Sequence, residues 1–313
     1  MKKQILSTKD LAHENTTQKE DKFKVPTQKP NFKDVNSFIN SLYFVGNQST
    51  NLSKAIEALK HEKFVLAFSS NIISTGLRGL VIDLIRKDLV KRVVTTAGGV
   101  EEDIIKIHND TYICGFDQSG EYLRKNGMNR IGGVLMKNDS YELLETILNE
   151  CFNLILKDKK DDDVLKITPT KFLKKVGNKI LDLTNKENIN SVLTSCIEKN
   201  IPYNPVCLTD GSFGDILSFY IRNKEIFLDI VGDFKESNCE KPTNVLIIGD
   251  GNVKNRVLSD QKNIKNVVIL TSKEYYDGSD IVETNFSAKN IIRVYGDATI
   301  TFPLLFGGLT LDF

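Results

Sequence analysis

Val93-Val94-Thr95-Thr96-Ala97-Gly98-Gly99-Val100-Glu101-Glu102-Asp103 is the stretch that decides the fold of this chain. It begins as a β-branched apolar run, passes through two adjacent glycines and ends in three consecutive acids. A buried strand that ends in a glycine turn and opens a helix can bind a dinucleotide, because glycine lets a phosphate approach the backbone and the first helical N–H groups point at it. An ordinary strand-to-helix turn fits the same spacing, since short glycine motifs are weakly specific.

The three acids at the end of this stretch would repel a phosphate if they pointed toward it. They are better interpreted as residues of the first helical turn, where the helix dipole favours negative charge. A seat for a cationic substrate is the alternative interpretation, and the sequence leaves both open.

Composition excludes several classes of protein. The chain has 313 residues, of which 40% are hydrophobic, enough for one large core or two modest ones. Its formal net charge of +1 provides no basic field for nucleic acid or for an anionic membrane. No apolar run is long enough to span a membrane, and the N-terminus lacks the apolar core of a signal peptide. We therefore expect a soluble cytoplasmic protein that binds neither nucleic acid nor membrane.

Histidines and cysteines are few and scattered. The three histidines are His13, His61 and His108, and none lies in a glycine-bounded loop where a catalytic triad or a zinc site would need it. We expect all three on the surface. The five cysteines show no metal-ligand spacing, so we expect reduced cysteines and no metal site.

Apolar strand-like runs alternate with helical patterns along most of the chain. The expected strands cover residues 64–68, 93–95, 112–115, 206–208, 226–231, 245–248, 267–270 and 291–294. Such alternation predicts an α/β fold, a Rossmann-like parallel sheet with helices on both faces. Ligands in such a sheet lie beyond the carboxyl ends of the strands.

Two regions fall outside this alternation. Residues 1–30 are polar with almost no apolar periodicity, which predicts a flexible or docking N-terminal arm. Residues from about 137 to 200 are charged and predicted to be helical, with Thr168-Pro169 as an N-cap and first helical position. No linker rich in Gly, Ser or Pro divides the rest, so residues 31–313 are expected to form one domain.

Six motifs together resemble one family, and they occur in that family's order. They are Ser70-Asn71-Ile72-Ile73-Ser74-Thr75-Gly76, Thr95-Thr96-Ala97-Gly98-Gly99-Val100-Glu101-Glu102-Asp103, Asn126-Gly127-Met128-Asn129-Arg130-Ile131-Gly132, Leu208-Thr209-Asp210-Gly211-Ser212-Phe213-Gly214-Asp215, Asp277-Gly278-Ser279-Asp280 and Val294-Tyr295-Gly296-Asp297-Ala298. On these motifs the chain is identified as a member of the deoxyhypusine synthase family.

This resemblance implies an activity and an assembly. The activity is NAD-dependent transfer of the butylamine group of spermidine to a specific lysine of the translation factor five-A precursor. Family members are tetramers whose sites form between subunits, and an N-terminal segment caps the site of a neighbouring subunit. The resemblance therefore implies an NAD-binding domain at residues 31–313, in a homotetramer or in a heterotetramer with a catalytic paralogue.

The resemblance also assigns residues to the site. Those expected to bind NAD are Ser70, Asn71, Thr95, Ala97, Gly98, Glu101, Asp210, Gly249, Gly251, Thr271, Ser272, Asp297 and Ala298. Those expected to line the polyamine slot are Glu102, Asp215, Asp280 and Glu283, since an extended polycation needs several spaced carboxylates. The residues alone leave another interpretation for Asp210 and Asp297, because an Asp after a strand is often a helix N-cap.

Four departures from the family pattern fall on the half of the site that would hold the reactive lysine. Lys289 is the candidate nucleophile, but Ser287 stands where the family has tryptophan, and the segments on both sides of Lys289 are short. Asn255 replaces a polyamine-binding histidine. Asp250 interrupts a glycine run, where its charge would cost up to about 4 kcal/mol at 4 Å from a phosphate at an effective dielectric constant of 20.

These departures favour one hypothesis over two others. The leading hypothesis is a deoxyhypusine synthase subunit whose own lysine site is impaired and which acts with a partner subunit. The alternatives are a self-sufficient synthase that uses Lys289, and a non-catalytic scaffold that binds NAD. An NAD-dependent deacetylase would need the cysteine pairs of a zinc ribbon, which the sequence lacks.

Overall fold

The central strand of the molecule is apolar along its whole length and feeds two separate cores. Strand β1 (Phe64–Phe68) is completely buried. Its alternate side chains Phe64, Leu66 and Phe68 join the large core on one face of the sheet, while Val65 and Ala67 join a smaller core on the other face. A strand buried on both faces must read as a continuous apolar run, which is why no polar alternation is visible in this stretch.

The structure is a computed structural model, and it describes residues 34–157, 164–184, 189–221, 226–236, 243–260, 264–274 and 290–311. The predicted N-terminal arm, with His13, lies outside the described residues. So do the site candidates Asp280, Glu283 and Lys289. None of the described helices is long and apolar enough to cross a membrane.

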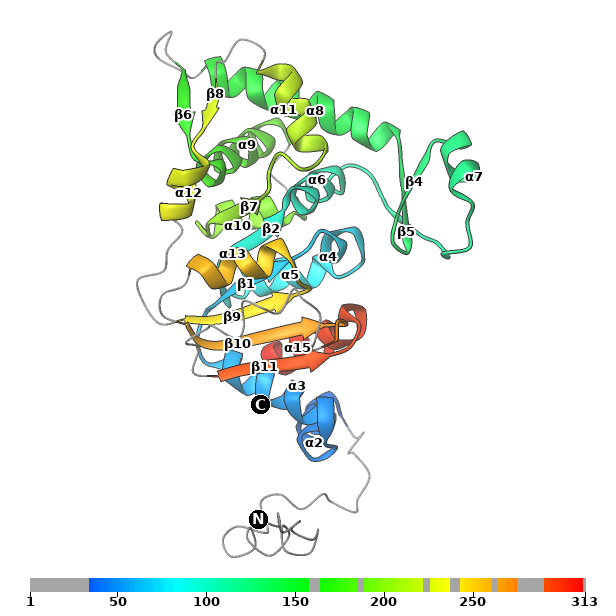
Figure 1. Ribbon diagram of the computed structural model, residues 1–313, viewed down its shortest axis with the longest axis vertical. Helices are drawn as coiled ribbons and strands as arrows, with labels where there is room; N and C mark the ends of the chain where they lie inside the picture. The colour runs from blue at the N-terminus through cyan, green and yellow to red at the C-terminus, as the bar shows by residue number, and fades with distance from the viewer. Residues whose placement is uncertain are drawn as a thin grey trace, which may run out of the picture.

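The main sheet has six parallel strands, in the spatial order β11 (Asn290–Tyr295), β10 (Ile264–Thr271), β9 (Thr243–Ile248), β1, β2 (Val90–Thr96) and β7 (Tyr203–Val206). The chain runs outward from β1 to β7 and then returns to the other side of β1 (Figure 1). This is the strand order of a doubly wound dinucleotide-binding fold, whose switch point lies between β1 and β9. The predicted fold class is confirmed.

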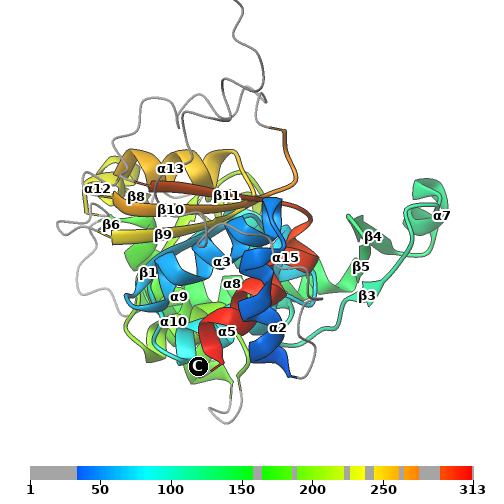
Figure 2. The ribbon, with the colours of Figure 1, turned by 90° about the horizontal axis from the view of Figure 1, so that it is seen from below.

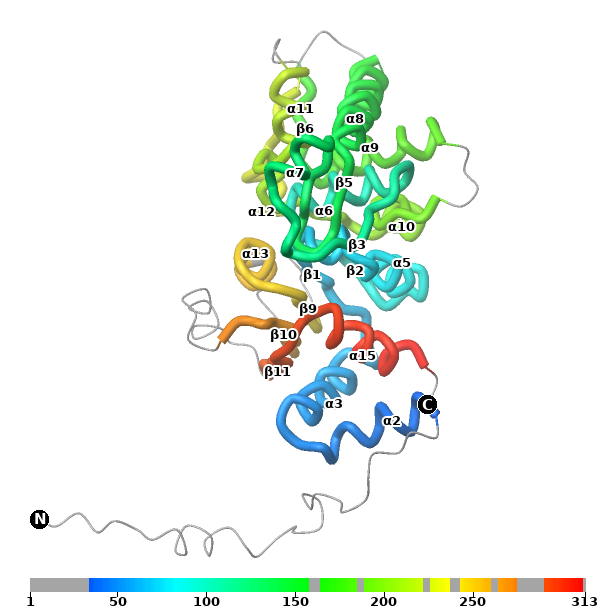
Figure 3. Tube along the Cα trace, turned by 90° about the vertical axis from the view of Figure 1, so that its right-hand side faces the viewer, coloured from blue at the N-terminus to red at the C-terminus, as the bar shows by residue number. Residues whose placement is uncertain are grey.

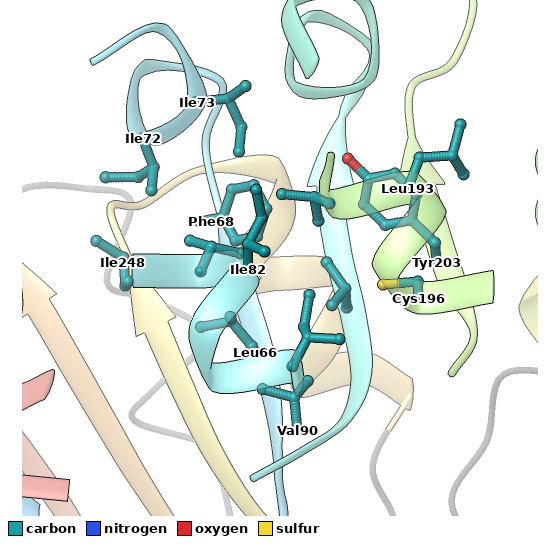
Figure 4. Packing of buried hydrophobic residues seen from close by; sticks show 14 of the residues in the cluster. Leu66, Phe68, Ile72, Ile73, Ile82, Val90, Leu193, Cys196, Tyr203 and Ile248 are labelled. Carbon is teal, nitrogen blue, oxygen red and sulfur yellow. The ribbon is translucent and has the colours of Figure 1, made fainter. Parts of the chain in front are cut away.

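Helices cover both faces of this sheet, as Figure 2 shows. On the face of the large core lie α3 (Asn47–Lys60), α5 (Arg78–Arg86) and α15 (Ala298–Thr310). On the opposite face α13 (Asn252–Asp260) packs Val253 and Val257 against the smaller core. Figure 4 shows the large core, where Leu66 and Phe68 of β1 lie beside Ile82 of α5.

The first and last described helices pack together. Helix α2 (Val35–Ser41) and the short helix η2 (Leu42–Phe44) lie next to α3, and α15 contacts both α2 and α3. In the tube view the blue and red segments lie side by side (Figure 3). The remaining helices along the chain are α4 (Asn71–Ser74), α6 (Ala97–Ile105), α7 (Gly120–Lys125), α8 (Asp139–Lys157), α9 (Pro169–Leu183), α10 (Val192–Glu198), α11 (Ser212–Tyr220) and α12 (Ile230–Glu236).

The predicted helical region packs as a layer beyond β7. Phe152 of α8, Phe172 of α9 and Phe213 of α11 form its aromatic centre, with ring centroids 5.6 Å apart for Phe152–Phe172 and 6.0 Å for Phe152–Phe213. Thr168 is the N-cap residue of α9 and Pro169 its first helical residue, as predicted. The Thr168 side chain caps nothing, however, and Thr170 N donates instead to Asp233 Oδ1 at 3.0 Å.

Three of the predicted strands are misplaced. Residues 112–115 contribute β3 (Tyr112–Ile113), which pairs antiparallel with β5 (Val134–Lys137) and not with the main sheet. Strand β4 (Met128–Ile131) completes this small sheet, which projects from the body together with α7 (Figures 1 and 2). We call residues 111–138 the projecting arm.

The other two predicted strands differ from the observed ones in their bounds and in their neighbours. Residues 226–231 divide into β8 (Ile226–Leu228), which pairs with β6 (Leu165–Ile167) in a separate two-stranded sheet, and the start of α12. The strand expected at 206–208 ends at Val206, because Cys207 has a positive φ of 53°. Asn204, inside that strand, is buried as a hydrogen-bond partner of Arg92, so apolar periodicity could not locate it.

Candidate functional site

A cavity of about 620 Å³ opens at the carboxyl ends of the strands that meet at the switch point. Its walls come from the segments after β1, β9, β10 and β11 and from the projecting arm. The lining residues include Asn71, Ser74, Gly249, Asp250, Thr271, Ser272, Asp297 and Ala298 from the strand ends and Ile113, Phe116 and Ile131 from the arm. Both the volume and the place are those of a small-ligand site in a doubly wound sheet.

The turn after β9 leaves its backbone open toward this cavity. Gly249 and Gly251 have positive φ angles of 98° and 74°, a conformation that side chains rarely adopt. A Cβ at Gly249 would lie 3.1 Å from Ser69 Oγ, whereas a Cβ at Gly251 would meet no atom within 4 Å. The turn can therefore accept a ligand group close to its main chain.

Asp250, between these glycines, does not oppose a phosphate as its sequence position suggests. Its side chain is 5% exposed, and Oδ1 lies 3.3 Å from the ammonium nitrogen of the buried Lys254. Its Oδ2 accepts a hydrogen bond of 2.5 Å from Thr271 Oγ1. The carboxylate is thus paired inside the protein, so the repulsion of about 4 kcal/mol expected for an unpaired charge is largely compensated.

Asp297 and Asp210, which were both possible helix N-caps, have different roles in the structure. Asp297 caps α15, because its Oδ1 accepts from Thr299 N at 2.8 Å. These hydrogen bonds lower the pKa of Asp297. The N-cap position of α11 belongs to Gly211, and Asp210 is exposed. The capping interpretation is therefore confirmed for Asp297 and wrong for Asp210.

The glycines and acids of the deciding stretch lie differently from expectation. Helix α6 starts at Ala97 immediately after β2, so Gly98 and Gly99 belong to the helix and none of the acids lies in its first turn. A Cβ at Gly99 would lie 2.3 Å from Thr95 Oγ1, and one at Gly98 would lie 3.1 Å from Ser70 Cβ. The glycines thus let α6 approach the strand ends, and the first-turn interpretation of the acids is wrong.

Glu101 holds a distant loop. Its Oε1 accepts a hydrogen bond of 2.9 Å from Phe213 N at the start of α11. A Cβ at Gly211 would lie 2.3 Å from the same oxygen, so a side chain there would displace the Glu101 carboxylate from this position. Burial raises the pKa of Glu101, the backbone N–H groups of Phe213 and Ser212 oppose this, and Asp215 raises it further. Glu101 therefore fixes the segment that carries Asp210 and Asp215.

Glu102 is a buried carboxyl that titrates near neutrality. It is 6% exposed and accepts a hydrogen bond from Ser74 Oγ. Burial raises its pKa to about 7, assisted by the charge of Glu101 and opposed by Ser74 and Lys106. Because Ser74 also lines the cavity, this carboxyl lies one hydrogen bond behind the cavity wall.

Asp103, the third acid, has a structural role. Its carboxylate accepts from Arg78 Nε at 2.8 Å, from Ser191 Oγ at 2.7 Å and from the backbone N–H groups of Val192 and Leu193 at 2.9 and 2.8 Å. It therefore binds the N-terminus of α10 to α6. A fully satisfied, buried carboxylate of this kind is not free to bind a ligand.

The structure separates the expected site residues into two groups. Asn71, Gly249, Thr271, Ser272, Asp297 and Ala298 line the cavity together. Ser70, Thr95, Ala97, Gly98, Glu101, Glu102, Asp210, Asp215 and Gly251 are not among its lining residues, although Gly98 packs on Ser70 beside it.

Sequence reasoning missed the apolar wall that the projecting arm contributes. Phe116 and Ile131 line the cavity, and Ile113, which lines it too, is 95% exposed. Ile131 lies in the motif at 126–132, which was matched to the family without any site role. His61 and His108 are exposed, as predicted. The described residues contain no cluster of His, Cys, Asp and Glu that could hold a metal ion.

Comparison with known proteins gives a consistent result. The family described as "Deoxyhypusine synthase" matches residues 37–309. The deoxyhypusine synthase of Encephalitozoon cuniculi is 35% identical over 293 residues, covering 88% of this chain and 86% of the relative. The deoxyhypusine synthase regulatory subunit of Trypanosoma brucei brucei is 31% identical over 302 residues, covering 87% of each chain.

A solved structure shares the fold. A deoxyhypusine synthase-type protein from Entamoeba histolytica superposes with a TM-score of 0.61 at 20% identity, covering 88% of this chain and 92% of that one. At this identity the likeness concerns the fold alone.

Proposed function

The chain belongs to the deoxyhypusine synthase family, and we propose that it is a cytoplasmic subunit of an enzyme that transfers the butylamine group of spermidine to a lysine of the translation factor five-A precursor. The observation that carries this proposal is the cavity at the switch point, which three of the six family-type motifs line: residues 70–76 after β1, 126–132 in the projecting arm and 294–298 after β11. Hypusine biosynthesis is the process in which such a subunit acts.

NAD is the cofactor that the family generally uses, and several residues predicted to bind it line the cavity. Asn71, Thr271, Ser272 and Ala298 would contact it from the cavity walls, and the main chain of Gly249, the glycine of the β9 turn that lines the cavity, would admit a phosphate. Bound NAD would supply the acceptor for a hydride from the polyamine.

Carboxylates near the cavity suit a polycationic substrate. Glu102 lies behind Ser74, and Glu101 holds the loop that carries the exposed Asp215. An ion pair in water contributes at most about 1 kcal/mol, but a pair in a closed, poorly solvated slot contributes more. We therefore assign Glu102 and Asp215 to polyamine binding, together with Asp280 and Glu283 from outside the described residues.

We further propose that the lysine site of this chain is impaired and that the chain acts in a heterotetramer with a catalytic paralogue, whereas a homotetramer belongs to the self-sufficient alternative. Ser287 and Asn255 replace groups that the family pattern places on the lysine half of the site, whereas Asp250, the other departure, lines the cofactor cavity. Asn255 lies exposed in the first turn of α13, after the turn that contains the cavity residue Gly249. The likeness to a regulatory subunit at 31% identity supports this arrangement.

A self-sufficient enzyme that uses Lys289 is the second candidate. It is favoured by the 35% identity to a relative named simply as a deoxyhypusine synthase, over 88% of this chain. The two candidates share the cofactor site and differ in whether Lys289 receives the butylamine group.

Calorimetric titration of the purified full chain with NAD tests the part that both candidates share. The exposed Asn71 lines the cavity, so Asn71→Ala removes a ligand contact with little effect on the fold. Loss of one hydrogen bond predicts an affinity about 5- to 10-fold weaker. Asn40→Ala, an equally exposed position on α2 that does not line this cavity, is the matched control. Absence of NAD binding to the wild-type chain, or equal affinity in Asn71→Ala, would contradict the cofactor site.

A further inference from the structure

Lys106 lies directly after α6 and reaches across to α4. Its Nζ donates hydrogen bonds to the carbonyl oxygens of Ile73 at 2.9 Å, Ser74 at 2.9 Å and Thr75 at 3.1 Å. These carbonyls belong to the end of a single-turn helix, where main-chain acceptors have no partner within the helix. An ammonium group has three donors, so the half-buried Lys106 satisfies three such acceptors at once.

The residue that Lys106 holds also contacts Glu102. The Ser74 carbonyl accepts from Lys106, while the Ser74 hydroxyl donates to Glu102 Oε2. Lys106 follows Glu102 by four residues, so both act on Ser74 from the same side of α6. The position of Lys106 is itself fixed, because Arg78 donates to its carbonyl at 3.4 Å and to Asp103.

The segment fastened in this way is a wall of the candidate cofactor cavity. Asn71, Ser74 and Thr75 all line it. Thr111, at the base of the projecting arm, donates to the Ser74 carbonyl at 3.3 Å, so the arm contacts the same point. Three elements, namely α4, the C-terminal half of α6 with Lys106 after it, and the projecting arm, therefore meet at Ser74, and Lys106 provides a cationic contact among them.

We propose that Lys106 is a positioning residue, whose ammonium holds segment 71–76 against α6 so that Ser74 keeps its hydrogen bond to the polyamine-binding carboxylate of Glu102. This inference rests on the proposed function and adds to it a residue that contacts neither ligand. It also couples the two halves of the site, because the same segment lines the cofactor cavity and sets the environment of Glu102.

The electrostatic surroundings of Glu102 give this role a measurable signature. Glu101 faces it from its own helix and Lys106 from the residue directly after that helix. Ser74 faces it from α4, Tyr141 from α8 and Tyr203 from β7. Ser74 and Lys106 lower the pKa of Glu102, and burial and Glu101 raise it. Removal of the ammonium must therefore raise this pKa above its wild-type value of about 7. A polycation binds the ionised carboxylate, so its binding must shift to higher pH.

The test compares Lys106→Met, which keeps the chain length and removes the charge, with Lys106→Arg, which keeps charge and donors. Lys125→Met is the matched control, because Lys125 is exposed on α7 and pairs only with the exposed Glu121 among the described residues. For the full chain, spermidine and NAD affinities are measured by calorimetry from pH 6 to 8.5. Unfolding by urea without ligand is followed over the same range.

We expect Lys106→Met to weaken spermidine binding about 10-fold at pH 7, as for one charge-assisted hydrogen bond or ion pair in a buried site, and to raise the pH midpoint of binding. Lys106→Arg should stay within about 3-fold of wild type, and Lys125→Met should be unchanged. Ser74→Ala, which leaves the three carbonyl contacts available, should raise the midpoint as well, and it serves if Lys106→Met does not fold.

Wild-type affinity together with an unshifted midpoint in Lys106→Met or in Ser74→Ala would overturn the proposal. Failure of the wild-type chain to bind spermidine would instead contradict the proposed function. The unfolding series in the absence of ligand then still decides the role of Lys106, because it reports the titration of Glu102 without any substrate. A midpoint unchanged by Lys106→Met in that series overturns the positioning role.

Discussion

Replacing Glu102 by glutamine should remove a loss of stability that the wild-type chain undergoes as pH rises toward neutrality. Burial raises the pKa of Glu102 from 4.5 to about 7. The folded state therefore binds a proton at Glu102 more tightly than the unfolded state does. The resulting stabilisation is fully present below pH 4.5 and is lost as pH rises through about 7.

The size of this effect follows from the two pKa values. Their difference of about 2.5, at about 1.4 kcal/mol for each pKa unit, gives a loss of roughly 3 kcal/mol from Glu102 by pH 8. Glutamine keeps the shape and can still accept from Ser74 Oγ, but it does not titrate. Relative to wild type, Glu102→Gln should therefore gain roughly 3 kcal/mol of unfolding free energy between pH 4.5 and pH 8.

Urea unfolding at several pH values measures this difference. The chain has no tryptophan, so circular dichroism is a better probe than intrinsic fluorescence. Other carboxyl groups contribute nearly equally to wild type and variant and largely cancel in the difference. Glu145→Gln, at an exposed position of α8, is the control and should show no such pH-dependent gain. A difference between wild type and Glu102→Gln that is constant with pH would refute the buried titration.

Three further predictions concern packing, pairing and assembly. Asp250→Asn removes the carboxylate beside the buried Lys254 and should lower the free energy of unfolding, measured with urea, by about 3 kcal/mol. The double variant Asp250→Asn/Lys254→Met should lose less stability than Asp250→Asn alone, and a loss in the double variant equal to the sum of the two single losses would contradict the pairing. Gly99→Ala places a Cβ 2.3 Å from Thr95 Oγ1 and should cost about 1–3 kcal/mol of unfolding free energy, so an unchanged denaturation midpoint would contradict this packing. Light scattering after size exclusion should show a dimer or tetramer, and a clean monomer, alone and with any paralogue, would remove the basis for a shared site.

The sheet could be predicted from the sequence because the signal for a buried parallel strand is local. Phe64–Phe68 and Thr243–Ile248 are completely buried, and each is a mainly apolar segment whose residues favour β-strands. Their motifs fall at the strand ends because a doubly wound sheet places its ligands there. The position of strand β7 could not be predicted in this way, because it contains the buried polar Asn204. The side-chain oxygen of Asn204 accepts a hydrogen bond from Arg92, which lies 112 residues earlier in the sequence.

The roles of the acids depended on partners that no local pattern specifies. Glu101 accepts from Phe213 N, which is 112 residues away, and Asp103 accepts from Val192 N, which is 89 residues away. Helix periodicity places these acids on α6 but says nothing about which loop folds over them. Because the three acids are adjacent in the sequence, a common role is expected. In the structure Glu101 binds the loop before α11, Asp103 binds the N-terminus of α10, and Glu102 lies behind the cavity wall.

Transfer of label from spermidine to the translation factor five-A precursor tests the central claim most directly. The purified chain alone should transfer little label, because Ser287, Asn255 and the short segments around Lys289 remove groups that the family pattern places there. Its complex with a competent paralogue should be active and barely affected by Lys289→Ala in this chain. Robust transfer by the lone wild-type chain, abolished by Lys289→Ala, would contradict the account and identify a self-sufficient synthase.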